Sequence, residues 1–234
     1  MAGLGTNELA RATSLAVDKA KRCGCEHDYS AALTTSTTFQ FLGVFAADEI
    51  PAQQGSQQHS ICFIANTDPS TLPGTHWVAF VVLKPKPPVT GGASTVYFFD
   101  SYGLPLSFYA SLHSECLRRG YATVRAANTL QLQSVHSTVC GQYCILFLFF
   151  ACRFRSAVLA ARTLRDLASS VGRRDMAVLS CVNRLLRSPQ RVCNEAVWPL
   201  MTGSFLTPNS ENDAAASCCV TQCCCARVHV DSHV

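Results

Sequence analysis

The sequence contains little charge and no long hydrophobic run. Charged residues make up 15% of the 234 residues and hydrophobic residues 48%, a composition that excludes an intrinsically disordered protein. The most apolar stretch, 145–152, is bounded by Arg153 and Arg155 and is too short to cross a bilayer. It therefore predicts a buried helix. The sequence also lacks an internal repeat, and its length favours one core.

The N-terminal stretch MAGLGTNELARATS lacks the charged segment and apolar block of a signal peptide, so we expect a protein that is not secreted. The 14 cysteines are then expected to be reduced thiols, metal ligands or buried side chains rather than a disulfide framework. A formal net charge of +4 permits contact with nucleic acid or an acidic partner without requiring it.

The predicted elements run in the order helix, strands, helices. Apolar positions at helical spacing predict a first helix over 7–22. β-branched and aromatic segments predict strands at 39–45, 60–66, 76–83, 95–103 and briefly within 123–133. Further helices are expected at 108–119, 140–154, 156–170 and 174–187. Because the strands are contiguous in sequence, an α+β fold is favoured over a doubly wound α/β sheet.

Cys140 lies where the polar segment QSVHSTV gives way to the predicted apolar helix. A thiol at a helix start meets unpaired N–H groups and the positive end of the helix dipole, and both stabilise the reactive thiolate. Gly141 permits a close backbone approach. The alternative is a buried structural cysteine, which is our expectation for Cys144 one turn later. Position alone therefore favours Cys140 as a nucleophile without selecting it among the 14 cysteines.

His76 opens one predicted strand and Asp100 ends the next. Neighbouring antiparallel strands bring the start of one beside the end of the other. We expect Asp100 to accept the proton of His76 Nδ1, which leaves Nε2 facing the thiolate. The alternative is an edge histidine and a turn-forming aspartate in the segment DSYG.

Gln133 lies seven residues before Cys140, where its amide could donate to an oxyanion alongside the Cys140 backbone N–H. Gln131 is the nearby competitor, and a simply exposed glutamine is the other alternative. The joint order of His-Trp, an Asp between aromatic residues, and Gln-x6-Cys-Gly selects His76, Asp100, Gln133 and Cys140 as the candidate site.

These segments resemble the adenain family, the adenovirus-type maturation proteases, within the wider group that includes proteases of ubiquitin-like proteins. The resemblance rests on FLG at 41–43, Asn66-Thr67, GTHWVAF at 74–80, FFDSYG at 98–103, QSVHSTVCGQYC at 133–144 and LLRSPQ at 185–190. It implies His76 as base, Asp100 as orienting acid where adenain has Glu, Gln133 as oxyanion donor and Cys140 as nucleophile.

The resemblance also implies a papain-like cysteine protease core of the adenain type, with a central mixed sheet flanked by helices. This single domain would cover residues 1–205, and residues 206–234 would form a flexible Cys-rich tail. The implied reaction is peptide-bond hydrolysis through a thioester, on viral precursor polypeptides cut near Gly-rich sites during virion maturation. The implied location is the host nucleus and the virion.

The chemistry as implied requires no cofactor, although adenain-type proteases use an activating peptide and DNA. That peptide is disulfide-bonded to a cysteine between the acid and the glutamine, but residues 117–132 contain no Cys and Cys116 comes too early. We therefore expect activation by another route. DNA contact would require several of the arginines to share one face, namely Arg118, Arg119, Arg153, Arg155, Arg173, Arg174, Arg184, Arg187 and Arg191. Such arginines more often form a solvated surface.

Two other functions stay open. Asp100-Ser101 favours a protease that removes ubiquitin-like modifiers, but Val139 stands where those proteases carry an acidic residue. A catalytically inactive DNA-binding or capsid-binding module is the second alternative, and the intact set of four candidate residues argues against it.

Cysteine clusters at 23–27 and 218–225, the latter followed by His229 and His233, have some metal-ligand character. Three residues separate Cys225 from His229, a loop much shorter than a zinc finger needs. We therefore expect no metal and a thiol-rich tail, in which acylation is an alternative fate for the adjacent cysteines.

Overall fold

The computed structural model describes residues 5–22, 39–53, 59–84 and 94–187. Both cysteine clusters, the boundary at residue 205 and the predicted tail lie outside the described residues. The same holds for Arg191 and for the last three residues of LLRSPQ. Among the described helices, none is both long and apolar enough to span a membrane.

A five-stranded mixed sheet forms the centre of the molecule. Its strands are β1 (Phe39–Phe45), β2 (Ser60–Asn66), β3 (Trp77–Leu83), β4 (Thr95–Phe99) and β5 (Val124–Ala126), and they lie side by side in chain order. The inner strands β2, β3 and β4 pair antiparallel, whereas β1 and β5 pair parallel with their neighbours. The predicted α+β fold with a central mixed sheet is confirmed.

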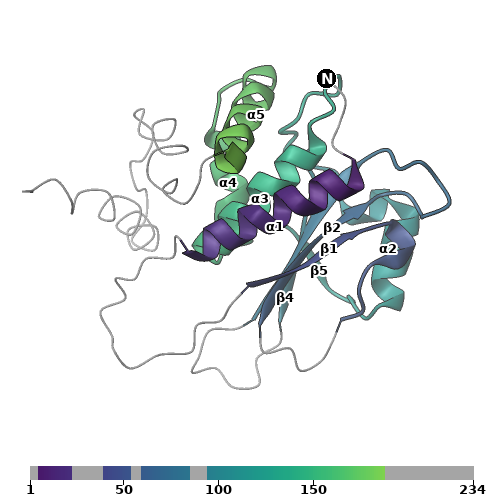
Figure 1. The fold of residues 1–234 in the computed structure, drawn as a ribbon. Coiled ribbons are helices and arrows are strands. Elements are labelled where there is room, and N and C mark those ends of the chain that lie inside the picture. The colour runs from purple at the N-terminus through teal and green to yellow at the C-terminus, as the bar shows by residue number, and fades with distance from the viewer. Residues whose placement is uncertain (1–4, 23–38, 54–58, 85–93, 188–234) are drawn as a thin grey trace, which may run out of the picture.

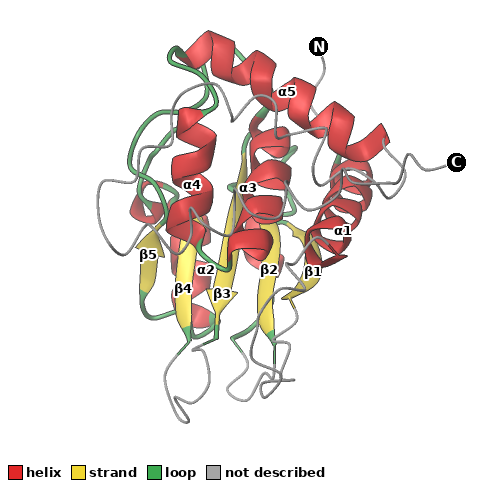
Figure 2. Cartoon of the chain, turned by 90° about the vertical axis from the view of Figure 1, so that its left-hand side faces the viewer, coloured by secondary structure: helices red, strands yellow, loops and turns green. Residues whose placement is uncertain are grey.

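Helices cover both faces of the sheet (Figures 1 and 2). One face carries α1 (Thr6–Arg22) and α3 (Cys140–Phe154), with α4 (Ala157–Asp166) and α5 (Val171–Arg187) packed against α3. The opposite face carries α2 (Ala110–Arg118). A short 3-10 turn at 47–49 lies between β1 and β2. A second one at 106–108 precedes α2, which therefore begins two residues later than predicted.

Alternation along the strands separates two cores. In β2, Cys62 and Ile64 point into the core shared with α1 and α3, and Ile61 and Phe63 point into the core under α2. Successive side chains of a strand point to opposite faces, and both faces are covered here, so the strands are apolar throughout. This explains why the strand segments read as continuous hydrophobic runs.

Helix α3 is buried along most of its length, as its apolar sequence predicts. The ring of Phe147 stacks on Phe99 at the end of β4, with 4.2 Å between centroids. One turn into the helix, the thiol of buried Cys144 donates to the carbonyl of Trp77 at the start of β3, at 3.4 Å. Cys144 is therefore the structural cysteine that was predicted. These contacts hold the first turn of α3 against the ends of β3 and β4.

Candidate active site

The loop between β2 and β3 presents His76. The Asp68 carboxylate closes this loop by accepting hydrogen bonds from the backbone N–H and hydroxyl of Thr75, at 2.8 and 2.7 Å. Gly74 adopts φ +78°, and a Cβ there would lie 2.4 Å from the Asn66 side chain. Only glycine fits such a left-handed, crowded position without strain. The loop therefore holds His76 at the entrance to β3.

Asp100 follows β4 in a tight turn rather than continuing the strand to residue 103 as predicted. The turn is closed by a hydrogen bond of 3.0 Å from the N–H of Gly103 to the carbonyl of Asp100. Gly103 has φ +74°, and a Cβ there would lie 2.6 Å from the backbone of Leu130. The turn thus requires glycine at this position for both conformation and space.

The Asp100 carboxylate is 1% exposed and accepts four hydrogen bonds. Its Oδ1 accepts from His76 Nε2 at 2.6 Å and from the Tyr102 N–H at 3.0 Å. Its Oδ2 accepts from the Leu104 N–H at 2.9 Å and from the Tyr109 hydroxyl at 3.0 Å. A buried carboxylate with this many donors is held in one orientation.

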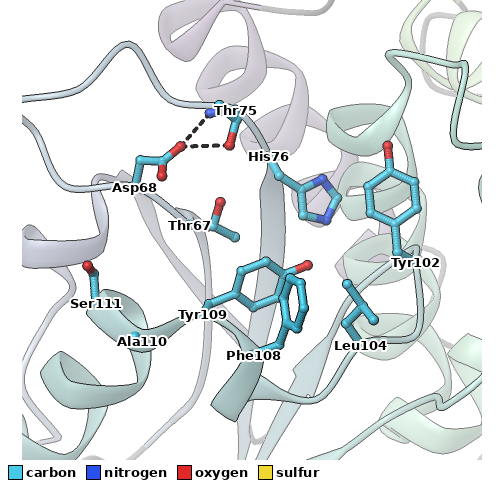
Figure 3. A pocket seen from close by; sticks show the side chains of 10 residues that line it. All are labelled: Thr67, Asp68, Thr75, His76, Tyr102, Leu104, Phe108, Tyr109, Ala110 and Ser111. Atoms are coloured by element: carbon cyan, nitrogen blue, oxygen red, sulfur yellow. Dashed lines mark hydrogen bonds between the residues drawn. The ribbon is translucent and has the colours of Figure 1, made fainter.

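The expectation for the His76 ring atoms is wrong. Asp100 meets Nε2 rather than Nδ1, so the nitrogen left to face Cys140 is Nδ1. The reason is the direction from which the carboxylate approaches, since the turn after β4 places it beyond the far edge of the ring. Tyr102 and Tyr109 stack on the imidazole, with centroids at 4.6 and 6.0 Å, and they keep the ring in that orientation (Figure 3).

Cys140 is the first residue of α3, and its thiol lies close enough to the His76 side chain for each group to shift the pKa of the other. The backbone N–H groups of Trp77 and Gly141 also stabilise the ionised sulfur and lower its pKa. Val139, at the N-cap position, contributes no side-chain cap. The Gly141 N–H belongs to the first turn of α3, where unpaired N–H groups and the helix dipole favour a thiolate.

Charge on His76 and Cys140 is mutually stabilising. Burial lowers the pKa of His76, but hydrogen bonds and charge from Asp100 and Cys140 outweigh it and raise that pKa to about 9. Burial raises the pKa of the Cys140 thiol, but His76 and the backbone N–H groups of Trp77 and Gly141 bring it below its ordinary value. Each group therefore favours the charged form of the other, a Cys140 thiolate beside a His76 imidazolium.

Other described cysteines lack such an environment. Burial raises the pKa of Cys116 to about 12 and that of Cys181 to about 11, and it raises the pKa values of Cys144 and Cys152 well above the ordinary range. These thiols are unreactive at neutral pH, which sets Cys140 apart from them.

Gln133 is fully buried, and both ends of its amide have partners. Oε1 accepts from the Ser101 hydroxyl at 2.7 Å, and Nε2 donates to the Ser137 carbonyl at 2.9 Å. Nε2 also points at the Tyr102 hydroxyl, 3.4 Å away, and the Tyr102 ring stacks on His76. Gln131, the competitor, is exposed and bonds only to the Gln133 carbonyl among its described contacts. Gln133 therefore contacts Tyr102, the residue whose ring stacks on His76.

Helix α5 holds the backbone on both sides of Gln133. The Leu132 carbonyl accepts from the Tyr143 hydroxyl at 2.9 Å and from Arg174 Nη1 at 3.2 Å. The Ser134 N–H donates to the Asp175 carboxylate, with its nearer oxygen at 3.2 Å. Arg174 was expected on a solvated surface and is instead buried, because its guanidinium satisfies carbonyls at helix and loop ends.

A pocket of about 460 Å³ opens beside His76 (Figure 3). Asp68 and Thr75 border one side of it, and aromatic side chains border the other. The residues that line it are Thr67, Asp68, Thr75, His76, Tyr102, Leu104, Phe108, Tyr109, Ala110 and Ser111. Phe108 is 65% exposed, so this wall offers apolar surface to a bound molecule.

Sequence reasoning missed Ser101, Tyr102 and Tyr109, although all three contact the candidate residues. Ser101 and Tyr102 directly follow Asp100, and this adjacency was a usable signal. No sequence pattern marked Tyr109, because its approach to Asp100 depends on how the chain turns between β4 and α2.

A helix-borne thiolate paired with a histidine, whose second nitrogen meets a buried carboxylate, is the arrangement of a cysteine protease. The family profile described as adenovirus endoprotease matches residues 41–198, more than half of the chain. The chain belongs to the adenovirus endoprotease family and is a viral cysteine endopeptidase.

Relatives from two adenoviruses agree with this assignment. The protease of porcine adenovirus A serotype 3 is 27% identical over 165 residues, which cover 66% of this chain and 76% of that protein. The protease of bovine adenovirus C serotype 10 is 32% identical over 104 residues, 40% of this chain and 49% of that protein. A crystal structure of an ASFV protease aligns over 51% of this chain and 42% of its own, at 20% identity and a TM-score of 0.30.

Proposed function

We propose that Cys140 is the nucleophile of this endopeptidase, His76 its general base and acid, Asp100 the group that orients His76, and Gln133 the side-chain donor to the oxyanion. The observation that carries the proposal is the continuous chain of contacts from Asp100 through His76 to Cys140. Each link is buried or half-buried, so water competes weakly with it.

Catalysis begins from the ion pair of the Cys140 thiolate and the His76 imidazolium. The sulfur attacks the carbonyl carbon of the scissile peptide bond, and the carbonyl oxygen becomes an oxyanion. The Cys140 N–H and Gln133 Nε2 donate to that oxyanion. As the tetrahedral intermediate collapses, the C–N bond breaks and the proton on His76 Nδ1 passes to the leaving amine, which leaves a thioester on Cys140.

Hydrolysis of the thioester reverses these roles. The now neutral Nδ1 of His76 removes a proton from water, and the hydroxide equivalent attacks the thioester carbon. The oxyanion formed in this second step accepts hydrogen bonds from the same two donors, the Cys140 N–H and Gln133 Nε2. Its collapse expels the Cys140 thiolate and releases the carboxylic acid product, so the starting ion pair is restored. Asp100 accepts the hydrogen bond from Nε2 throughout and keeps the ring in one orientation.

The substrates we propose are viral precursor polypeptides, cut near Gly-containing sites during virion maturation. Family membership supports this choice. The pocket beside His76 supports it further, because the aromatic and aliphatic wall formed by Tyr102, Leu104 and Phe108 suits an apolar side chain near the scissile bond.

We propose that the chemistry needs no cofactor and that activation does not use a disulfide to Cys116. That thiol is fully buried in the core under α2, and burial raises its pKa to about 12, so a peptide thiol has neither access nor a thiolate to exchange with. An activating peptide would therefore have to bind without a covalent bond.

DNA as a partner and the host nucleus as a location follow from the family resemblance alone. Arg118 and Arg119 bond to Glu115 on α2, whereas Arg173 and Arg174 belong to α5 on the opposite side of the sheet. These arginines do not form the single basic face on which DNA binding is usually built.

A peptide carrying a cysteine-directed electrophile after a Gly-containing sequence tests the nucleophile. We expect stoichiometric labelling of the wild type, none of Cys140→Ala, and normal labelling of a matched control, Cys181→Ala, which removes a buried thiol of α5. Equal labelling of the Cys140→Ala variant would overturn the assignment.

Substrate class is tested separately, with Gly-containing peptides from viral precursors and a ubiquitin-like precursor offered side by side. We expect cleavage of the viral peptides. Cleavage of the ubiquitin-like precursor alone would overturn the proposed substrates and leave the proposed nucleophile standing.

A further inference from the structure

Ser101 makes three hydrogen bonds to the segment that carries Gln133. Its hydroxyl donates to Gln133 Oε1 at 2.7 Å. Its carbonyl accepts from the N–H groups of Leu132 and Gln133, at 2.8 and 3.0 Å. Ser101 is 1% exposed and Gln133 is 0% exposed, so water does not substitute for these contacts.

The orientation of the Gln133 amide follows from its two partners. The Ser137 carbonyl can only accept a hydrogen bond, so the amide nitrogen must face it at 2.9 Å. Oε1 must then face Ser101, whose hydroxyl serves as the donor. A serine hydroxyl can rotate to donate or accept, so Ser101 could bond to either end of the amide. The Ser137 carbonyl fixes the orientation, and the Ser101 hydroxyl then donates to Oε1.

The second hydrogen of Gln133 Nε2 is directed away from Ser137 and toward the turn that follows Asp100. Its direction is marked by the Tyr102 hydroxyl at 3.4 Å. The Tyr102 ring stacks on the His76 imidazole, with 4.6 Å between centroids, and both burial and the negative charge of Cys140 raise the pKa of Tyr102. The bond to Tyr102 is the longer of the two that Nε2 makes, so its hydrogen is the one that the proposed oxyanion at Cys140 would use.

We propose that Ser101 is a positioning residue for the oxyanion donor, because its hydroxyl anchors Oε1 of the Gln133 amide in the orientation that the Ser137 carbonyl requires, with Nε2 toward the developing charge. This rests on the proposed role of Gln133. A reversed amide would present the negative end of its dipole to the oxyanion, so the same side chain would oppose the reaction instead of assisting it.

The turn at 100–103 therefore positions both the base and the proposed oxyanion donor. Asp100 orients His76, and the next residue orients Gln133, so a displacement of the 100–103 turn moves the base and the oxyanion donor together. Because the backbone carbonyl of Ser101 remains in any side-chain variant, the segment 132–133 stays anchored when the hydroxyl is removed.

Ser101→Ala tests the proposal through two reactions of the same sulfur. Hydrolysis of a Gly-containing peptide passes through an oxyanion, whereas alkylation of Cys140 by iodoacetamide displaces iodide without one. We expect kcat to fall by about tenfold or more, up to the roughly 10²–10³-fold typical of a lost oxyanion donor, with KM and the alkylation rate within about twofold of the wild type.

Two further variants control for loss of packing. Ser60→Ala removes another buried serine hydroxyl, which accepts from the Lys84 N–H far along the β2–β3 pair, and it should leave kcat unchanged. Ser101→Thr keeps a hydroxyl and should retain most of kcat. Ser101→Cys is a little larger than serine and only a weak donor, so it repeats the kcat comparison if Ser101→Ala fails to fold.

A double-variant cycle separates the outcomes. In a Gln133→Ala background, Ser101→Ala should cause no additional loss of kcat, because the amide that it orients is gone. If Gln133→Ala slows hydrolysis and Ser101→Ala does not, the positioning role is wrong and the proposed function stands. If Gln133→Ala itself leaves kcat unchanged, the proposed oxyanion role fails. An equal loss from Ser101→Ala in both backgrounds, or slower alkylation, would overturn the positioning role.

Discussion

Nε2 of His76 lies 2.6 Å from Oδ1 of Asp100, so the imidazole turns Nδ1 toward Cys140. This arrangement means that the proton on Nδ1, not the one on Nε2, is transferred in each step of the proposed reaction. The carboxylate that fixes Nε2 is itself held by the Tyr102 and Leu104 N–H groups and by the Tyr109 hydroxyl. The orientation of the base is therefore set by the turn after β4.

The pH dependences of alkylation and of hydrolysis should diverge in alkaline solution. The pKa of Cys140 lies below its ordinary value, so alkylation by iodoacetamide should reach its maximum at lower pH than for an ordinary thiol and should not fall at higher pH. His76 loses its proton as the pH rises through about 9 and can no longer protonate the leaving amine. Peptide hydrolysis should decline there, and parallel pH profiles of the two reactions would contradict the assignment.

His76→Ala should slow turnover and also raise the pKa of the Cys140 thiol. We expect kcat/KM to fall by about 10²–10⁴-fold, the usual contribution of a general base. The alkylation midpoint of Cys140 should move to higher pH, because the largest effects that lower the pKa of Cys140 come from His76. The matched control is His113→Ala on α2, which should alter neither quantity. Near-normal turnover in His76→Ala would reject its role.

Asp100→Asn should cost less than His76→Ala. The amide removes the negative charge that helps raise the pKa of His76, so the alkaline limb of hydrolysis should move to lower pH. We expect kcat at neutral pH to fall toward the lower end of about 10²–10⁴-fold. Asp166→Asn, an exposed carboxylate paired with Arg165, serves as control. An unchanged alkaline limb would show that Asp100 does not act on His76 as proposed.

Gln133→Ala and Gln131→Ala distinguish the two candidate donors. Gln133→Ala should lower kcat by about 10²–10³-fold with little change in KM, because the lost contact forms with the oxyanion rather than with bound substrate. Gln131 is exposed, and its loss should leave kcat within a few-fold of the wild type. Steady-state kinetics on one peptide decides between them, and the reverse ranking would reassign the donor.

Gly103→Ala should destabilise the protein and impair the site. A Cβ at this position would lie 2.6 Å from the Leu130 backbone, and the residue has φ +74°. We expect a loss of about 1–3 kcal/mol or more in the free energy of unfolding. Gly172→Ala is the matched control, since a Cβ there meets nothing within 4 Å and the residue is helical. Denaturant unfolding should rank Gly103→Ala well below both wild type and Gly172→Ala.

Much of the scaffold could be predicted from local pattern. The strands at 39–45 and 60–66 and the helix at 140–154 match their predicted bounds, because their periodicity and apolar content are strong. The strand from 95 ends at Phe99 instead of residue 103, because Asp100 and Gly103 close a turn that the aromatic pattern concealed. Helix α5 begins at Val171, three residues earlier than predicted.

The sequence by itself determined the order and types of the reactive residues, since a thiol at a helix start, a histidine before a strand and an aspartate after one are local features. Tertiary structure alone decided that Nδ1 faces Cys140, that Ser101 holds the Gln133 amide and that Tyr109 meets Asp100. These contacts join segments far apart in the chain, and they depend on the angle at which side chains approach. Neither the contacts between distant segments nor the angles of approach are encoded in the spacing of residues along a single helix or strand.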